Sequence, residues 1–280
     1  MSFPSSSRSE LATPGSPTPF DGQALEFDCR VGFPAEDCRA IAAAVLSLAE
    51  ARPGDSMAEI GAGTGMIGRW FLAHPVRYLG LDLSRGMLEV FRHLPAVRKP
   101  WLVQADGART WPIPDGSLRG VFSSRAIHLL PLDHVVAELF RVAAPGGAAC
   151  VLGWVERRPE SVKARMSREM QRRLRERGFA ARSAGSRRLL AACQARGARE
   201  LPRTAVARWP ARHTPRQSLD HWGSKVGLGG VVLPPGVQEE VLHELAAWAV
   251  EVFGDLDASH DSEEAYVLEG VRLPESGGRG

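Results

Sequence analysis

The chain has 280 residues, of which 44% are hydrophobic, so it can bury the core of an α/β domain and still carry an additional segment. It has no run of about 18 apolar residues and no basic start followed by an apolar stretch, which argues against a membrane-spanning helix and a secretory signal. The net charge of +3 is unevenly distributed, because residues 157–188 hold twelve Arg or Lys against three Glu. A uniformly basic nucleic-acid-binding protein would not show this pattern.

The N-terminal region and the cysteines predict general properties of the protein. Residues 1–19 are rich in Ser, Pro, Thr and Gly, a composition typical of a disordered tail. The bias of 32 Arg to 3 Lys is typical of a high-GC bacterium. Four cysteines lack metal-ligand spacing, so we expect reduced thiols, a cytoplasmic location and no metal site: Cys29, Cys38, Cys150 and Cys193.

A glycine-rich turn after the first predicted strand is the most informative motif. Residues 33–50 have the apolar spacing of a helix, and the strand that follows ends at Ile60. Residues 61–65 then read Gly-Ala-Gly-Thr-Gly, directly after Glu59 and Ile60, and a helix is predicted from there to just before Pro75. Because only Gly tolerates such a tight turn close to a ligand, this segment predicts a nucleotide-type pocket.

The next elements alternate between strands and helices. Strands are predicted over residues 78–82, 101–106, 121–124 and 148–155, and helices over residues 84–94 and 132–142. This alternation indicates βαβ units in a parallel sheet with helices on both faces. Ligands bind at the carboxyl ends of the strands in such sheets, where we expect Glu59, Gly61, Asp82, Asp106 and Ser124.

The alternation ends after residue 155. Helices are predicted over residues 156–180, 185–195, 214–224 and 236–253, and strands over residues 204–213 and 264–273. The predicted fold class is therefore α/β, a doubly wound, seven-stranded, mostly parallel Rossmann-like sheet with a helical lid insertion. The expected units are a tail (1–19), a core with an N-terminal cap helix (20–155), a lid with the sixth strand (156–230), a last helix and strand (231–273) and a flexible tail (274–280).

Residues 38–155 resemble a class I S-adenosylmethionine-dependent methyltransferase of the small-molecule type, similar to the quinone-biosynthesis C-methyltransferases and trans-aconitate methyltransferase. The resemblance rests on Glu-Ile-Gly-Ala-Gly-Thr-Gly at residues 59–65, on Asp82 and Asp106, and on the Arg-x-x-x-Pro-Gly-Gly stretch at residues 141–147. One departure is Leu118-Arg119-Gly120, where the family commonly has an acid before its fourth strand; we expect this position to be structural. The resemblance implies an enzyme that uses S-adenosyl-L-methionine as cofactor and binds its substrate within the 156–230 region.

The resemblance also implies the cofactor contacts. The loop over residues 59–65 would hold the methionyl part, Asp82 the ribose hydroxyls and Asp106 the adenine amino group. The full set of implied cofactor-binding residues is Glu59, Gly61, Ala62, Gly63, Thr64, Gly65, Asp82, Leu83, Met87, Asp106, Gly107, Ser124 and Arg125. Carboxylates accept hydrogen bonds from a diol or an amine and suit a cationic sulfonium, whereas they would repel a diphosphate.

We expect a small-molecule acceptor, O-methylated in bacterial secondary metabolism. Removal of a proton from an acceptor hydroxyl would favour His128, just past the fourth strand, as general base. Less favoured bases are His134, His213 and His221. Trp209 lies in the region expected to line the acceptor pocket.

Several alternatives stay open. The reaction could be C- or N-methylation of an anionic or aromatic acceptor, and a catalytically idle cofactor-binding partner is another reading. Residues 63–68 also fit Gly-x-Gly-x-x-Gly, as in a NAD-dependent dehydrogenase. The Arg-rich residues 157–188 could form a solvated helix face, capture an anionic substrate or bind RNA, but Phe179 is their single aromatic residue, so nucleic acid is not expected. The protein is expected to be a monomer or homodimer.

Overall fold

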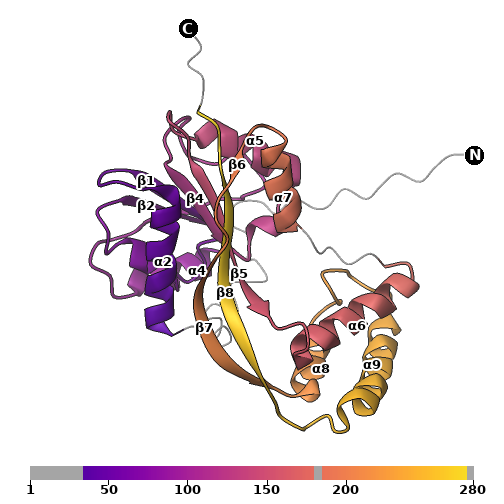
Figure 1. Ribbon diagram of the computed structural model, residues 1–280. Coiled ribbons are helices and arrows are strands. Elements are labelled where there is room, and N and C mark those ends of the chain that lie inside the picture. Colours follow the sequence, from indigo (N-terminus) through magenta and orange to yellow (C-terminus); the bar gives the residue numbers. More distant parts are fainter. Residues whose placement is uncertain (1–33, 180–184, 276–280) are drawn as a thin grey trace, which may run out of the picture.

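The computed structural model describes residues 34–179 and 185–275, and Figure 1 shows a central sheet covered by helices and a second group of helices beyond it. The tail predicted over residues 1–19, like Cys29, lies outside the described residues. None of the described helices combines the length and the apolar composition needed to cross a bilayer.

The sheet has the predicted width and direction. Its parallel strands are β1 (Ser56–Ile60), β2 (Arg77–Asp82), β3 (Trp101–Gln104), β4 (Gly120–Ser124) and β5 (Ala149–Arg157), and β8 (His260–Arg272) is antiparallel to β5. The spatial order is β3-β2-β1-β4-β5-β8. Two further strands, β6 (Arg199–Glu200) and β7 (Thr204–His213), pair with successive parts of β8, so the sheet is seven strands wide although eight strands are assigned.

Helices cover both faces of the sheet. On one face lie α2 (Ala35–Ala49), α3 (Gly68–Phe71) and α4 (Arg85–His93), and on the other lie α5 (Leu132–Val142) and α7 (Gly185–Gln194). Successive residues of β4 show the arrangement, because Val121 packs with the α5 side and Phe122 with the α2 side. The helix predicted after the glycine turn is shorter than expected, since regular α-helix begins only at Gly68.

The second helical group has its own core. It contains α6 (Val162–Glu176), α8 (Pro215–Gly223) and α9 (Val237–Phe253), and it follows the ends of β5 and β7 and precedes β8 (Figure 1). Met166, Met170 and Leu245 are among its buried residues. The helix α7, placed in the lid from the sequence, packs instead against α5, where Leu189 and Cys193 are buried in the core of the main sheet.

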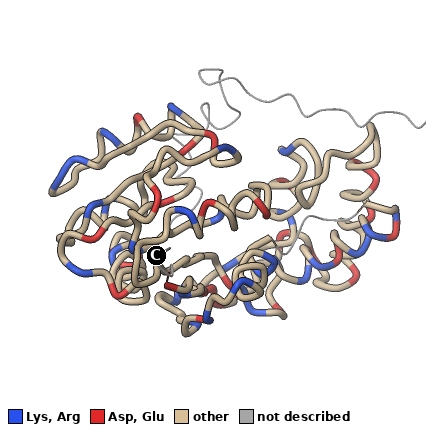
Figure 2. Tube along the Cα trace, turned by 90° about the horizontal axis from the view of Figure 1, so that it is seen from above, with Lys and Arg blue, Asp and Glu red and all other residues tan. Residues whose placement is uncertain are grey.

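Three arginines of the Arg-rich stretch form ion pairs within the helical group. Arg173 on α6 and Arg177 at its C-cap each lie 2.5 Å from Glu244 on α9, and Arg172 and Arg173 both contact Glu169. Figure 2 shows basic and acidic residues interleaved along these helices. These contacts favour a helix face with internally paired charges, close to the predicted solvated helix face, over an RNA-binding surface.

Candidate functional site

The glycine turn bends the chain sharply at the carboxyl end of β1. Gly61, Gly63 and Gly65 have φ angles of +78°, +55° and +79°, which disfavour residues with a Cβ atom. A Cβ at Gly61 would lie 2.1 Å from Ala126, and one at Gly65 would lie 2.1 Å from the Phe91 ring. A Cβ at Gly63 would meet nothing within 4 Å, so this glycine borders open space.

Asp82 is fixed at the carboxyl end of β2 by two backbone donors. Gly63 N donates to Asp82 Oδ2 and Ser84 N donates to Asp82 Oδ1, each at 2.8 Å. Ser84 is also the N-cap of α4, because its Oγ accepts a hydrogen bond from Met87 N. The carboxylate therefore couples the glycine turn to the start of the next helix.

Asp106 lies just past the end of β3 and is partly exposed. Its Oδ1 accepts a 2.9 Å hydrogen bond from Ala108 N, and its Oδ2 lies 3.6 Å from Arg109 Nε. The side chain is 25% exposed, which leaves it accessible to a ligand.

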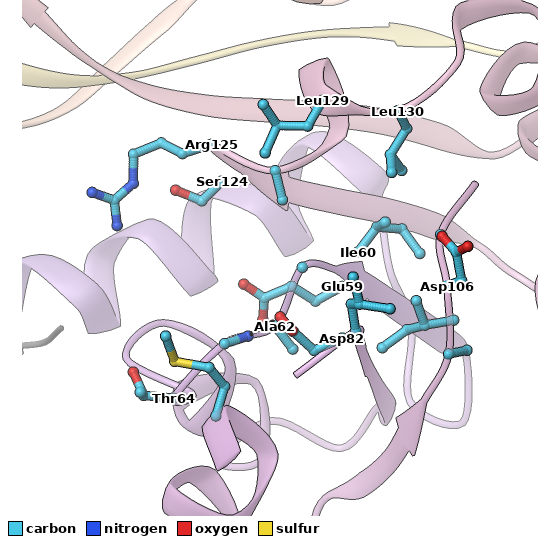
Figure 3. A pocket seen from close by; sticks show the side chains of 18 of the residues that line it. Glu59, Ile60, Ala62, Thr64, Asp82, Asp106, Ser124, Arg125, Leu129 and Leu130 are labelled. Atoms are coloured by element: carbon cyan, nitrogen blue, oxygen red, sulfur yellow. Dashed lines mark hydrogen bonds between the residues drawn. The ribbon is translucent and has the colours of Figure 1, made fainter. Parts of the chain in front are cut away.

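A single cavity of about 450 Å³ joins these features. Figure 3 shows Asp82 between Glu59 and Asp106, with Ser124 and Arg125 at the opposite end from Asp106. The sequence-predicted residues that line it are Glu59, Gly61, Ala62, Gly63, Thr64, Asp82, Leu83, Met87, Asp106, Gly107, Ser124 and Arg125. Gly65 is not part of this lining, since it packs against Phe91.

Several lining residues were not singled out from the sequence. They are Ile60, Met66, Ile67, Leu81, Ala105, Ala108, Ala126, Leu129 and Leu130. Ile60 and Leu81 directly precede Gly61 and Asp82, the residues expected at the strand ends, so their positions in the sequence could have identified them as lining residues. Leu129 and Leu130 come from the turn after β4, η2 (Ile127–Leu129), and make one wall apolar (Figure 3).

Glu59 is buried beneath the glycine turn. Tyr78 Oη donates a 2.5 Å hydrogen bond to Glu59 Oε2, and only 3% of Glu59 is exposed. Burial raises the pKa of Glu59 to about 8, an effect that the Tyr78 hydrogen bond opposes and the nearby Asp82 reinforces. The carboxyl group is therefore mostly protonated at neutral pH in the protein alone.

The other end of the cavity is held by a hydrogen bond between distant segments. Tyr266 Oη on β8 donates to Ser124 Oγ at 2.6 Å. Gly153 on β5 allows this approach, because a Cβ there would lie 2.2 Å from the tyrosine oxygen. The next residue, Arg125, has a φ of +63°, an uncommon conformation for a non-glycine residue. The chain has two tyrosines, Tyr78 and Tyr266, and both contact a side chain that lines this cavity.

The structure places the histidines considered as bases outside the cavity lining. His128 lies on η2, is exposed, and packs near Gly185 at the start of α7; desolvation lowers its pKa. His134 Nε2 is hydrogen-bonded to Arg109 O, His213 lies beside Glu264, and His221 is near the end of α8. Within the described ranges no group of three or more His, Cys, Asp or Glu side chains could hold a metal ion.

The known proteins that this chain resembles include methyltransferases. A methyltransferase-domain family matches residues 58–151. Malonyl-[acyl-carrier protein] O-methyltransferase of Serratia marcescens is 33% identical over 104 residues, which cover 37% of this chain and 40% of that protein. An uncharacterized 37.1 kDa protein encoded in a Streptomyces fradiae transposon is 34% identical over 119 residues, 39% of this chain and 33% of that one. The chain thus matches well under half the length of both curated relatives.

Solved structures share the fold over most of the chain. A Bacillus halodurans protein assigned as a methyltransferase has a TM-score of 0.54 at 17% identity, covering 83% of this chain and 98% of that one. The YcgJ protein of Bacillus subtilis has a TM-score of 0.52 at 18% identity, with the same coverage. The match over residues 58–151 favours a methyltransferase-type over a dinucleotide-type interpretation of the glycine turn, and with it S-adenosyl-L-methionine as the cofactor that this domain would bind.

Proposed function

We propose that this protein transfers the methyl group of S-adenosyl-L-methionine to a small-molecule acceptor and that the methylated atom is an oxygen. The observation that carries the proposal is the single cavity in which the glycine turn, Asp82 and Asp106 meet at the carboxyl edge of the sheet. The Serratia relative is named an O-methyltransferase, which supports oxygen as the attacked atom. C- or N-methylation of an anionic or aromatic acceptor is the second candidate.

The residues around the cavity fit the cofactor chemically. Open space beside Gly63 leaves room for the methionyl part, Asp82 can accept hydrogen bonds from the ribose hydroxyls, and Asp106 can accept one from the adenine amino group. Leu129 and Leu130 offer an apolar wall. We propose that the other sequence-predicted residues that line this cavity also contact the cofactor.

The cofactor supplies an activated methyl group on a sulfonium, so the protein has mainly to align the acceptor and exclude water. Ser124 and Arg125 are at the end of the cavity away from Asp106 (Figure 3), where the acceptor would approach. We propose that Tyr266 orients Ser124 there through its 2.6 Å hydrogen bond. A carboxylate acceptor is already ionised at neutral pH and needs no base. A hydroxyl acceptor would need one, and the candidate is His128, which lies on η2 next to the lining residue Leu129 without lining the cavity itself.

We further propose a bacterial cytoplasmic enzyme of secondary metabolism that acts as a monomer or homodimer and does not bind nucleic acid. Cys150 and Cys193 are buried free thiols, which suits a reducing compartment. Ion pairing of Arg172, Arg173 and Arg177 with Glu side chains argues against an RNA acceptor.

Calorimetric titration of S-adenosylmethionine and S-adenosylhomocysteine tests cofactor binding, and a panel of small acids, phenols and alcohols tests methyl transfer by release of S-adenosylhomocysteine. Binding of both nucleosides with turnover of a panel member supports the proposal. Binding without turnover of any acceptor favours an idle cofactor-binding partner, and tight RNA binding with steep salt dependence would favour an RNA methyltransferase.

A further inference from the structure

Three basic side chains from three different elements surround one carboxylate where the sheet meets the second helical group. Oε1 of Glu264 on β8 lies 3.0 Å from Arg157 Nε, 3.4 Å from His213 Nε2 and 3.6 Å from Lys163 Nζ. Arg157 ends β5, His213 ends β7 and Lys163 is the second residue of α6. We call these four residues the Glu264 cluster.

The donors of the Glu264 cluster exceed what its single carboxylate can accept. A guanidinium has five N–H groups and an ammonium three, yet the contacts of Arg157, Lys163 and His213 all converge on one oxygen of Glu264. The side chains of Arg157 and Lys163 are 41% and 35% exposed, so a ligand can reach them. His213 Nε2 is buried and lies 3.4 Å from Glu264 Oε1 without forming a hydrogen bond among the described residues, an arrangement that a ligand would explain.

The position of the Glu264 cluster relates it to the cofactor cavity. Arg157 lies at the carboxyl end of β5, the same edge of the sheet that bears the cavity. Glu264 and Tyr266 are two residues apart on one face of β8, a separation of about 7 Å along the strand. Tyr266 in turn contacts Ser124, which lines the cavity. The Glu264 cluster therefore lies two residues along β8 from the side chain that holds Ser124 at the edge of the cavity.

We propose that the Glu264 cluster binds an oxyanion of the methyl acceptor, a carboxylate or a phosphate group, while the reacting atom of the same molecule reaches the cavity beside Ser124. This assignment rests on the proposed function, because only a methyltransferase has an acceptor to hold. Arg157 offers a planar fork suited to such groups, and Lys163 and the first turn of α6 add positive potential.

A neighbouring ion pair provides a matched control. Arg158 follows Arg157 in the chain, and its guanidinium lies 3.1 Å from Glu263, which also contacts Arg208. Arg158 is 56% exposed and contacts Glu263 rather than Glu264. A neutral residue at position 158 therefore removes the same unit of charge without touching the Glu264 cluster.

The test is calorimetric titration of inorganic phosphate and of malonate, at low salt, into the wild type and three variants, with S-adenosylhomocysteine titrated in parallel. Lys163→Gln is expected to weaken anion binding about tenfold, as for loss of one charge-assisted hydrogen bond, and Arg158→Gln by less than about twofold. Glu264→Gln is expected to tighten anion binding at least about threefold, since it removes the internal competitor. All variants are expected to bind S-adenosylhomocysteine like the wild type.

Equal losses in Lys163→Gln and Arg158→Gln, weaker anion binding by Glu264→Gln that retains the wild-type melting temperature, or no binding of either anion would overturn the assignment. If Glu264→Gln does not fold, the test depends on Lys163→Gln. In Lys163→Gln the Arg157 guanidinium still neutralises Glu264, so this variant is expected to fold. Failure of every protein to bind S-adenosylmethionine or S-adenosylhomocysteine, with the anion pattern intact, would overturn the proposed function and support the oxyanion site.

Discussion

The Tyr266 hydroxyl donates a 2.6 Å hydrogen bond to Ser124 Oγ across 142 residues of sequence, and this bond ties the last strand to the edge of the cofactor cavity. Tyr266 is completely buried and reaches Ser124 over Gly153. We expect Tyr266→Phe to lower kcat/KM about tenfold for the acceptor found in the panel, with cofactor affinity changed by less than about twofold and stability reduced by ~1 kcal/mol. Steady-state kinetics and calorimetry check this split, and an equal loss of cofactor affinity would contradict the positioning role.

Loss of either carboxylate, Asp82 or Asp106, should weaken cofactor binding. Asp82→Asn and Asp106→Asn are each expected to weaken S-adenosylhomocysteine binding by about tenfold or more, because each would remove a charged acceptor. Asp133→Asn is the matched control, since Asp133 is exposed in the first turn of α5 and does not line the cavity. Calorimetry on the three variants measures the effect. Cofactor affinity in Asp106→Asn equal to that in the control would remove Asp106 from the binding site.

Two glycines of one turn should respond differently to alanine. Gly63→Ala places a methyl group in the open space where we place the cofactor, so affinity should fall about tenfold, with ~1 kcal/mol lost to the left-handed backbone. Gly65→Ala drives a methyl group into the buried Phe91 ring, so the main effect should be a lower melting temperature. Thermal unfolding with calorimetry separates the two, and the reverse order of effects would be inconsistent with this geometry.

Burial of Glu59 predicts a pH dependence of stability. Its pKa is about 8 in the folded protein against an ordinary 4.5, so the folded state holds a proton that the unfolded state has released between these values. Stability of the cofactor-free protein should therefore fall as pH rises from about 4.5 to 8, by at most ~5 kcal/mol. Glu59→Gln keeps an acceptor for Tyr78 and should flatten this dependence. Urea unfolding of both proteins from pH 5 to 8.5 measures it, and parallel profiles would contradict the assignment.

His128 has a conditional role. If the acceptor is a hydroxyl, His128→Ala should lower kcat about tenfold or more with little change in cofactor affinity. If the acceptor is a carboxylate, kcat should hardly change, because no proton has to be removed. Turnover measured with one acceptor of each kind distinguishes the cases, and near-normal turnover of a hydroxyl acceptor would exclude His128 as the base.

Local patterns were enough to predict most elements, because the signals for helices, strands and turns lie within about ten residues. The glycine turn and the acids at the carboxyl ends of β2 and β3 were placed correctly at one edge, since parallel strands bring these ends together. The strand at Thr204–His213 was predicted with its bounds. That this strand and β6 both pair with the same edge of β8 depends on long-range contacts and was not predicted.

Features that depend on tertiary packing could not be read from the sequence. The apolar face of α7 predicts a buried helix without saying that it packs against α5. The contact of Tyr266 with Ser124 depends on the register of β5 and β8, and the Glu264 cluster on three segments that meet only in the fold. Pairing of the Arg-rich stretch depends on Glu244, which is far away in sequence.

A crystal structure of the protein with S-adenosylhomocysteine is the most direct measurement. We predict the ribose hydroxyls on Asp82, the adenine amino group on Asp106 and the homocysteine part along the turn at Gly63. A nucleoside bound elsewhere, or bound in the cavity with neither carboxylate in contact, would contradict the proposed cofactor site.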